Sequence, residues 1–279
     1  MKKIKNVAIL ALLIGVLFAS NVFMFNLMAG GTRVGYCADD LIMQLAGNET
    51  INFTDREEEY IETVNGVPTY STTSELSNAC GAVAGAIIVG FYDKYYTDLI
   101  DGYASSFASS GKYKSADKTY IPALISKLYT LMRTNVDDVG VSESDCLSGL
   151  KSYVESTGHA IDYSSVKTAS KLNENNYKNA IEANKPVLIF SKQTEVYNFI
   201  MSDTYAEFSS TTVNGNHIFV GYGYYQIKYY NGSTNFRTDT YIKVASGLAQ
   251  QSTGYLKVSS TVDSNAGKWF DNGYVVSVS

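Results

Sequence analysis

The chain is poor in cysteine, histidine and proline, and each shortage limits what it can be. Its 279 residues include three cysteines, two histidines and three prolines. So little proline in a chain that is 45% hydrophobic argues against long disordered stretches. Three cysteines are too few for a disulfide framework in a domain of this size. Neither His159 nor His217 stands near a Cys-x-x-Cys pair, so no spacing fits zinc and we expect neither a metal nor an organic cofactor.

The charge balance is acidic. The formal net charge is −5, from 22 basic and 27 acidic residues. Removing residues 1–38 would delete Lys2, Lys3, Lys5 and Arg33 and no acids, which would leave 18 basic residues against 27 acidic ones, a charge of −9. An acidic protein of this kind is not expected to bind nucleic acid, and its charge favours solubility outside the cell.

The N-terminus has the layout of a bacterial export signal. A basic start is followed by an uncharged run from Val7 to Thr32. The run is also long enough to cross a bilayer as an uncleaved anchor. We therefore expect residues 1–38 to be a signal peptide or an N-terminal membrane anchor, and the protein to be secreted or held at the membrane by residues 7–32. Cleavage at residue 38 would remove Cys37 and leave Cys80 and Cys146.

The remaining sequence predicts a lead-in segment and one folded domain. Residues 39–70 form the lead-in, either a pro-segment or, on the favoured interpretation, an N-terminal strand pair, and residues 71–279 form the domain. Periodicity and capping patterns predict helices over 80–96, 120–133, 142–158 and 173–185, with a Ser-rich loop at 103–118. Strand patterns follow at 186–191, 217–230, 240–246, 254–260 and 273–279. Helices in the first half and antiparallel strands in the second predict an α+β fold.

The head of the first helix carries the clearest chemical signal. Cys80 opens an almost wholly apolar helix, whose positive end would stabilise a thiolate. The amides of Cys80 and Gly81 would be free to bind an oxyanion. His217 begins a strand 137 residues later, within the separation of about 130–150 residues seen between cysteine and histidine in papain-like chains. Packing or a disulfide remains the alternative role for Cys80.

Three blocks of sequence resemble a known family. SNACGAVAGAIIVGFY is similar to the cysteine helix of papain-like cysteine peptidases, and looks closest to the C39-like group. NHIFVGYGYY resembles the histidine strand of that superfamily, and YIKVASG with GYLKV resembles a third, C-terminal block. The resemblance spans residues 70–260. It implies a helical lobe carrying the cysteine helix, packed on an antiparallel sheet lobe carrying the histidine, with Cys80 and His217 as the catalytic pair.

The chain departs from that family at two positions. The family's Asn or Asp that orients the histidine falls on Ala245, which cannot bond to an imidazole. The adjacent Ser246 could do so weakly, whereas Asp239 is not well placed by the pattern. Ser74 stands where the family has an oxyanion-hole glutamine, and Asn78 is the nearest carboxamide that could replace it. A Cys–His dyad is therefore better supported than a triad, with Asn78, Gly81 and Ser246 as oxyanion or orienting candidates.

These features favour an exported cysteine peptidase, a hydrolase that forms a thioester with a peptide or protein substrate. The alternatives are a non-catalytic papain-like domain for extracellular binding or surface interaction, and a Cys–His amidase or acyltransferase acting on a non-peptide substrate. No nucleic-acid partner is expected, and contact with a membrane only through an uncleaved N-terminus. Cys146 is expected to pack in a helix, and a Cys80–Cys146 disulfide would exclude the peptidase. His159, just past a helix end, is expected to be a capping or surface residue.

Overall fold

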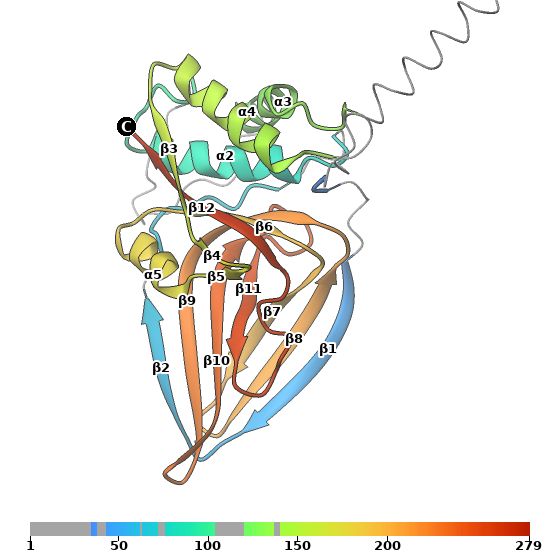
Figure 1. Cartoon of the computed structure of the whole chain (residues 1–279), viewed down its shortest axis with the longest axis vertical. Coiled ribbons are helices and arrows are strands. Elements are labelled where there is room, and N and C mark those ends of the chain that lie inside the picture. The colour runs from blue at the N-terminus through green and yellow to red at the C-terminus, as the bar shows by residue number, and fades with distance from the viewer. Residues whose placement is uncertain (1–34, 38–42, 62, 72–75, 104–119, 137–139) are drawn as a thin grey trace, which may run out of the picture. The chain divides into compact units, whose positions relative to one another are not determined.

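The computed structural model describes residues 35–37, 43–61, 63–71, 76–103, 120–136 and 140–279. Residues Gly35–Ser279 form one compact unit. Within its described part the helices are α2 (Cys80–Asp93), α3 (Tyr120–Leu131), α4 (Glu143–Ser156) and α5 (Glu174–Glu182). Figure 1 shows α2, α3 and α4 gathered at one end of the long strands, with α5 beside β9.

A large antiparallel sheet makes up the rest of the unit. Ten strands form this sheet, in the order β1-β8-β7-β11-β10-β9-β6-β12-β3, with β2 pairing β9 off this path. The two short strands β4 and β5 pair separately. The strands are β1 (Met43–Asn52), β2 (Asp55–Ile61), β3 (Ile161–Ser165), β4 (Lys167–Thr168), β5 (Lys171–Leu172), β6 (Val187–Ser191), β7 (Thr194–Met201), β8 (Tyr205–Val213), β9 (His217–Asn231), β10 (Thr234–Ala245), β11 (Thr253–Ser260) and β12 (Phe270–Val278).

Strand β9 pairs with three other strands, β10, β6 and β2, and carries His217 at its first position. One edge of β9 pairs along its length with β10. The other edge is shared, because its start pairs with β6 and its far part with β2. The first nine residues, His217–Tyr225, are all buried. An unbroken apolar run of this kind is what a strand covered on both faces requires.

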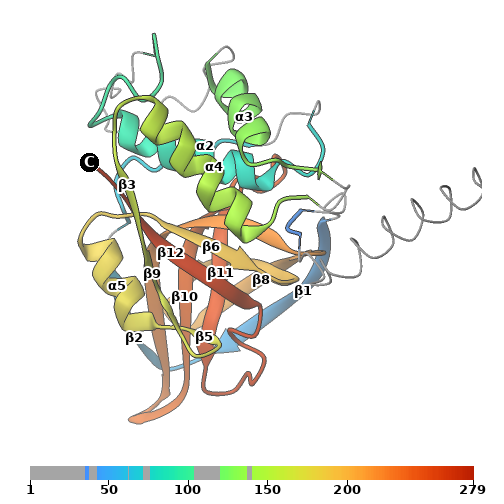
Figure 2. The same ribbon diagram turned by 45° about the horizontal axis from the view of Figure 1, so that its top comes forward.

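Helix α2 is buried on every side, as its sequence requires. All of its residues from Cys80 to Asp93 are buried, because almost none of them is polar and a helix that is apolar all round must lie in the core. It packs on α3, α4 and β9. Its glycines allow this closeness: a Cβ at Gly85 would lie 2.8 Å from Met132 Cε, and one at Gly90 would lie 2.6 Å from the Tyr70 hydroxyl. Figure 2 shows α2 lying beneath α3 and α4.

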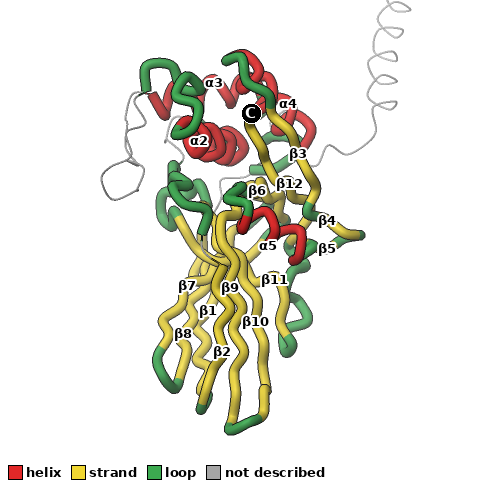
Figure 3. The backbone as a smooth tube through the Cα atoms, turned by 90° about the vertical axis from the view of Figure 1, so that its left-hand side faces the viewer, coloured by secondary structure: helices red, strands yellow, loops and turns green. Residues whose placement is uncertain are grey.

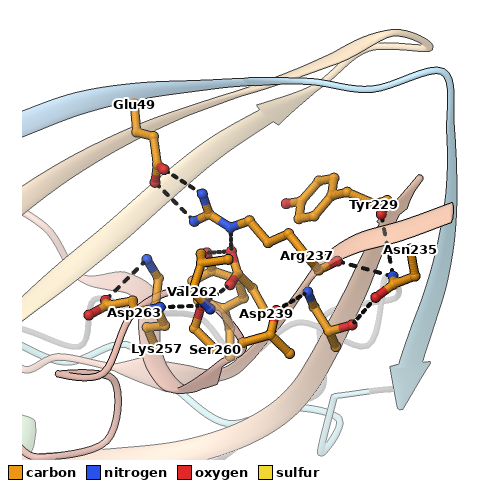
Figure 4. Close-up of polar contacts among 12 residues, drawn as sticks. Glu49, Tyr229, Asn235, Arg237, Asp239, Lys257, Ser260, Val262 and Asp263 are labelled. Carbon is orange, nitrogen blue, oxygen red and sulfur yellow. Dashed lines mark hydrogen bonds and ion pairs between the residues drawn. The ribbon is translucent and has the colours of Figure 1, made fainter. Parts of the chain in front are cut away.

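The end of the sheet far from the helices curls over a second core. Strand β1 stands four places from β10 in the sheet, which would separate the two by about 19 Å if the sheet were flat. The Arg237 guanidinium of β10 nevertheless bonds to both carboxylate oxygens of Glu49 on β1, as Figure 4 shows. Residues of β1, the turn after it, β8, β9 and β10 therefore meet in a second hydrophobic cluster: Ile51, Phe53, Ala206, Phe208, Tyr225, Ile227, Tyr229 and Tyr241. Figure 3 shows this strand-only end of the unit.

The observed elements confirm most of the sequence predictions. The α+β class is confirmed, as are the helices that begin at Cys80, Tyr120 and after Ser142. The Ser142 hydroxyl accepts a hydrogen bond from the Asp145 amide at 3.1 Å, and Gly158 has a φ of +88°, so both expected ends of α4 are present. The Ser-rich loop at 103–118 lies, from residue 104 on, outside the described residues. The expected leader, residues 1–38, lies outside them apart from residues 35–37.

The predicted pairing of the lead-in segment was wrong. Residues 43–52 and 55–61 are indeed strands, but they do not pair with each other. Instead β1 pairs with β8 and β2 pairs with β9, so the sheet is not confined to the second half of the chain. Local sequence cannot reveal this arrangement, because both partners are more than 150 residues away. Among the described residues, no helix combines the length and the apolar character that a membrane crossing requires.

Removing Asp239 should strongly destabilise the fold. Its fully buried carboxylate accepts from Arg237 Nε at 2.7 Å and from Ser260 Oγ at 2.6 Å. Asp239→Ala leaves a buried guanidinium without this partner, which should cost about 3–5 kcal/mol in the free energy of unfolding, measured by urea denaturation. Glu49→Gln is the matched control, because the Glu49 side chain is 45% exposed, and it should cost about 1 kcal/mol or less. Equal losses in the two variants would contradict this account of the network.

Candidate active site

Cys80 and His217 lie together, although 137 residues separate them in the chain. One ring nitrogen of His217 and the sulfurs of Cys37 and Cys80 all lie within 4.8 Å of one another. Cys80 is the first residue of α2 and His217 is the first residue of β9. Two rigid elements therefore present the two side chains from their ends, which is the placement expected from the sequence.

Gly81 allows Val141, which lies just before α4, to pack against the first turn of α2. A Cβ at Gly81 would lie 2.7 Å from Val141 Cγ1, 3.4 Å from Ile218 Cδ1 and 3.7 Å from Cys146 Sγ. The first of these contacts is too short for any side chain. Gly81 is thus a packing requirement of the site, in addition to the role expected for its amide.

The Cys80 sulfur is not free in this structure, because it forms a disulfide with Cys37. The two Cα atoms are 6.0 Å apart, an ordinary distance for a disulfide. The disulfide considered from the sequence, Cys80–Cys146, is not the one formed. Cys146 is a free, fully buried thiol on α4, as the packing interpretation expected. Burial, with smaller contributions from Glu143 and Asp145, raises its pKa to about 12.

His217 is held in one orientation by a main-chain carbonyl. Its Nε2 lies 2.7 Å from the Ser246 carbonyl oxygen. Since a carbonyl can only accept, Nε2 carries the hydrogen and Nδ1 has a free lone pair. Nδ1 is buried and has no hydrogen-bond partner among the described residues. The ring therefore presents an unprotonated nitrogen inside the protein, which is the form that a general base requires.

The environment of His217 makes its imidazole neutral. The side chain is fully buried, and this burial lowers the pKa to about 4, while the hydrogen bond to Ser246 raises it slightly. The sequence favoured an imidazolium paired with a thiolate. In the disulfide state there is no thiolate to pair with, so burial dominates and the ring gives up its proton.

The orienting group is the backbone next to Ala245. The sequence placed the family's orienting residue at Ala245 and suggested the Ser246 side chain as a weak substitute. It is the Ser246 carbonyl that bonds to His217, whereas the Ser246 hydroxyl donates to the Gln251 carbonyl. Asp239 cannot take this role: it pairs with Ile227, ten residues along β9 from His217, which is about 30 Å.

The oxyanion candidates divide into main-chain and side-chain groups. The amides of Cys80 and Gly81 lie in the first turn of α2, where they have no intrahelical acceptor, and Ala79 at the N-cap position offers no side-chain bond. The Asn78 side chain does not cap the helix. Its Nδ2 donates to Asn135 Oδ1 at 2.7 Å, so it is directed toward the segment after α3. Ser74 lies outside the described residues.

Residues Gly35–Cys37, which we call the plug, cover the pair. Cys37, Cys80 and His217 are all at most 2% exposed. Tyr36 and Val141 exchange two main-chain hydrogen bonds, at 2.8 and 3.0 Å, and the Cys37 amide donates to the Asn216 carbonyl at 2.8 Å. The Asn216 side chain donates to the Gly35 carbonyl at 3.2 Å. The plug is therefore bonded to the residue immediately before His217 and closes the site to solvent.

Two cysteines and a histidine are also donors that zinc prefers. Zinc binds thiolates, however, and a disulfide sulfur carries no negative charge. The residues present therefore do not fit a zinc ion while Cys37 and Cys80 are joined. The chemistry left to this site after reduction is that of a thiol beside a neutral imidazole at the positive end of a helix.

Sequence reasoning missed Cys37 and the residues that hold it. Cys37 was assigned to the leader, since the expected boundary at residue 38 follows it. The signal that could have identified it is the odd number of cysteines, three, in a chain expected to be exported. An odd number leaves at least one cysteine whose pairing has to be explained. Val141 and Asn216 act through their main chains, and a main-chain acceptor leaves no mark in the sequence.

Comparisons of the chain with protein-family models, with curated proteins and with solved structures found no match. The arrangement of Cys80, His217 and the plug therefore has to be interpreted from its own geometry.

The low pKa of His217 predicts a specific acid sensitivity of the oxidised protein. The unfolded histidine has a pKa of about 6.5 and the folded one about 4, so the unfolded state binds the proton first as the pH falls. The contribution of His217 to the free energy of unfolding should be fully present above pH 6.5. It should fall by about 3 kcal/mol as the pH is lowered to 4. Denaturation at stepped pH measures this loss, and subtraction of the profile of His217→Gln removes the carboxylates' contribution. A His217 titration midpoint near 6.5 by NMR would contradict the buried, neutral ring.

Proposed function

We propose that this chain is a cysteine peptidase whose nucleophile is Cys80 and whose general base is His217, and that the disulfide-bonded structure is its latent form. The observation that carries the proposal is a ring nitrogen of His217 within 4.8 Å of the Cys80 sulfur, in a ring whose Nε2 is fixed by Ser246 and whose Nδ1 has no hydrogen-bond partner among the described residues. A nucleophile, a base within reach and a third group that orients the base are the three parts of this type of site.

The surroundings of Cys80 support the same chemistry. Once reduced, its sulfur lies at the N-terminal end of a 14-residue helix, where the helix dipole favours the thiolate. A thiolate next to His217 would in turn raise the pKa of the imidazole, since an opposite charge favours the charged form. Reduction would thus convert a neutral ring and a disulfide into the reactive ion pair expected from the sequence.

The reaction follows from these positions. His217 Nδ1 takes the proton of the Cys80 thiol, and the thiolate attacks the carbonyl carbon of a peptide bond. The Cys80 and Gly81 amides donate to the oxygen that becomes negative. The imidazolium then protonates the leaving amine, which departs and leaves a thioester on Cys80. Water, deprotonated by His217, hydrolyses the thioester and restores the thiol.

The disulfide is consistent with a protein that functions outside the cell. Disulfides persist in oxidising compartments and are rare where thiols are kept reduced. The Cys37–Cys80 bond therefore supports the export suggested by the N-terminal sequence. It also implies that residue 37 stays in the oxidised protein, which favours release of any leader before Gly35, or an uncleaved anchor, over release at residue 38.

A non-catalytic domain is the second candidate, and the buried disulfide is the observation that favours it. A bond between residues 43 positions apart stabilises a fold by about 4 kcal/mol in the chain-entropy model. A purely structural role for Cys37 and Cys80 would explain the complete burial of the site. On this view His217 is a core residue bonded to Ser246, and the domain acts by binding.

Thiol reactivity after reduction distinguishes the two candidates. The full chain is reduced and alkylated with iodoacetamide between pH 5 and 10, and adducts are located by mass spectrometry. We expect Cys80 to react with a midpoint well below about 8.5, Cys37 to react with an ordinary midpoint and the buried Cys146 to remain unlabelled. His217→Ala should move the Cys80 midpoint up toward 8.5.

Hydrolysis of a mixed peptide library by the same samples tests the activity directly. It should appear only after reduction, whereas Cys37→Ser should be active without a reductant and Cys80→Ala inactive in both conditions. Cys146→Ser is the matched cysteine control and should behave like the unchanged chain. Equal, alkaline midpoints for Cys37 and Cys80 with no hydrolysis would contradict the peptidase and leave the structural disulfide.

A further inference from the structure

The plug is bound through its main chain. Tyr36 makes a single antiparallel bridge with Val141, and the Cys37 amide donates to the carbonyl of Asn216. The Asn216 side chain adds a bond to the Gly35 carbonyl. Cys37 has a left-handed φ of +63°, so the chain turns there and does not continue as a strand. These contacts use only backbone groups of the plug, so another peptide that turns after the bridge could form them, with Val141 and Asn216 as its cradle.

The side chain of Tyr36 fills a pocket of its own. It is 2% exposed and packs edge-on against Phe190, with ring centroids 5.1 Å apart. Its hydroxyl donates to Asp271 Oδ2 at 2.5 Å. Burial, and then this bond, raise the pKa of the phenol well above its usual value, and Glu143 and Tyr274 act in the same direction. We call this the tyrosine pocket: an aromatic wall from Phe190 and an acceptor from Asp271.

The register of the plug relates this pocket to the nucleophile. Tyr36 occupies the pocket, and the next residue, Cys37, lies over Cys80 with a Cα–Cα distance of 6.0 Å. A substrate bound in the same way would place the residue after its tyrosine beside the Cys80 sulfur. Both neighbouring peptide bonds are that close to its Cα, but the carbonyl of the tyrosine already accepts from the Val141 amide at 3.0 Å, so the peptide bond that follows is the one left to react.

We propose that the tyrosine pocket is the specificity pocket of the site for a peptide substrate, and that the plug is a tethered substrate mimic that holds its place. The proposal rests on the peptidase function argued above. It names the substrate class as a peptide with a tyrosine followed by a turn, cleaved one residue after the tyrosine. It also names the class of reagent that vacates the pocket, a dithiol reductant.

The release step balances as a thiol–disulfide exchange. A thiolate of the dithiol attacks the Cys37 sulfur, the Cys37–Cys80 bond breaks and Cys80 leaves as a thiolate. The second thiol of the reductant then displaces Cys37, which takes up a proton, and the reductant becomes a disulfide. Two electrons pass from the dithiol to the protein disulfide. The plug is afterwards held only by non-covalent contacts, for which a substrate can compete.

The charges around the pocket sharpen the expected selectivity. Asp271 accepts from the plug's phenol, and Glu143 contributes a second negative charge nearby. A neutral phenol is suited to this site, whereas a phosphate on the tyrosine would face two carboxylates. A phenylalanine would leave Asp271 without its donor. An arginine could reach Asp271 with its guanidinium, and the experiment has to exclude it.

Binding is measured first, without catalysis. The full chain carrying Tyr36→Ala, Cys37→Ser and Cys80→Ser has an empty pocket, no disulfide and no nucleophile. The fluorescent probe is acetyl-Val-Gly-Tyr-Ser-Ala-Asp, compared with versions containing phenylalanine, phosphotyrosine, arginine or alanine in place of the tyrosine. We expect the phenylalanine peptide to bind about 10-fold more weakly than the tyrosine one, since a hydrogen bond to a charged group is lost. Asp271→Ala should abolish this difference. Equal binding of the tyrosine and alanine peptides, or preference for phosphotyrosine or arginine, overturns the inference.

Cleavage is measured next, with Cys80 restored in the Tyr36→Ala, Cys37→Ser background. The expected product ends at the serine that follows the tyrosine. Selective binding without cleavage would support the proposed tyrosine pocket and contradict the proposed peptidase function. Cleavage without preference for tyrosine would support the peptidase function and contradict the proposed pocket.

A second pair of variants is needed because Tyr36→Ala removes a buried ring and could cause misfolding. Cys37→Ser combined with Cys80→Ser keeps Tyr36 as a tethered competitor without catalysis, and Tyr36→Phe in that background keeps the ring but removes its bond to Asp271. The tyrosine peptide should bind the second variant more tightly than the first, because the competitor it displaces is weaker. No difference between them would overturn the inference in chains that retain the packed ring.

Discussion

The site depends on one close contact, between the first turn of α2 and Val141, which lies just before α4. Gly81 stands at this contact, because a Cβ there would lie 2.7 Å from Val141 Cγ1. The main chain of Val141 in turn holds Tyr36. Ile218, the residue after His217, packs against the same glycine position at an ordinary distance of 3.4 Å. The positions of Tyr36, Cys80 and His217 are in this way products of the same packing around the fully buried helix.

The sequence predicted the parts of this site that reside in side chains and local periodicity. An apolar helix headed by Cys-Gly and a strand headed by His217 were both recognisable, because each is a continuous segment with its own pattern. The pairing of β1 with β8 and of β2 with β9 was not, since register between strands so distant in the chain depends on tertiary contacts. The curl of the sheet, with Arg237 reaching Glu49, was hidden for the same reason.

The orientation of His217 illustrates why the remaining details could not be predicted. A side chain in the orienting position would have been visible as an asparagine or aspartate. The acceptor used instead is the carbonyl of Ser246, and every residue has one. The same holds for Val141 and Asn216, whose backbone groups hold the plug. A search by residue type therefore underestimates a site built from main-chain acceptors, and Ala245 at the expected third position does not count against the dyad.

Electrostatics connect the disulfide to the state of the base. A fully buried imidazole without a counter-ion favours its neutral form, and the disulfide denies it that counter-ion. The bond that blocks Cys80 thus also keeps His217 uncharged, and a neutral pair costs little to bury, whereas a thiolate and an imidazolium sealed from water would be expensive. On the proposed mechanism, reduction would create both charges and, in the same event, remove the covalent hold on the plug that excludes water. Closing and opening the site would then be one chemical step, in which Cys37, the residue that blocks Cys80, also sets the protonation state of His217.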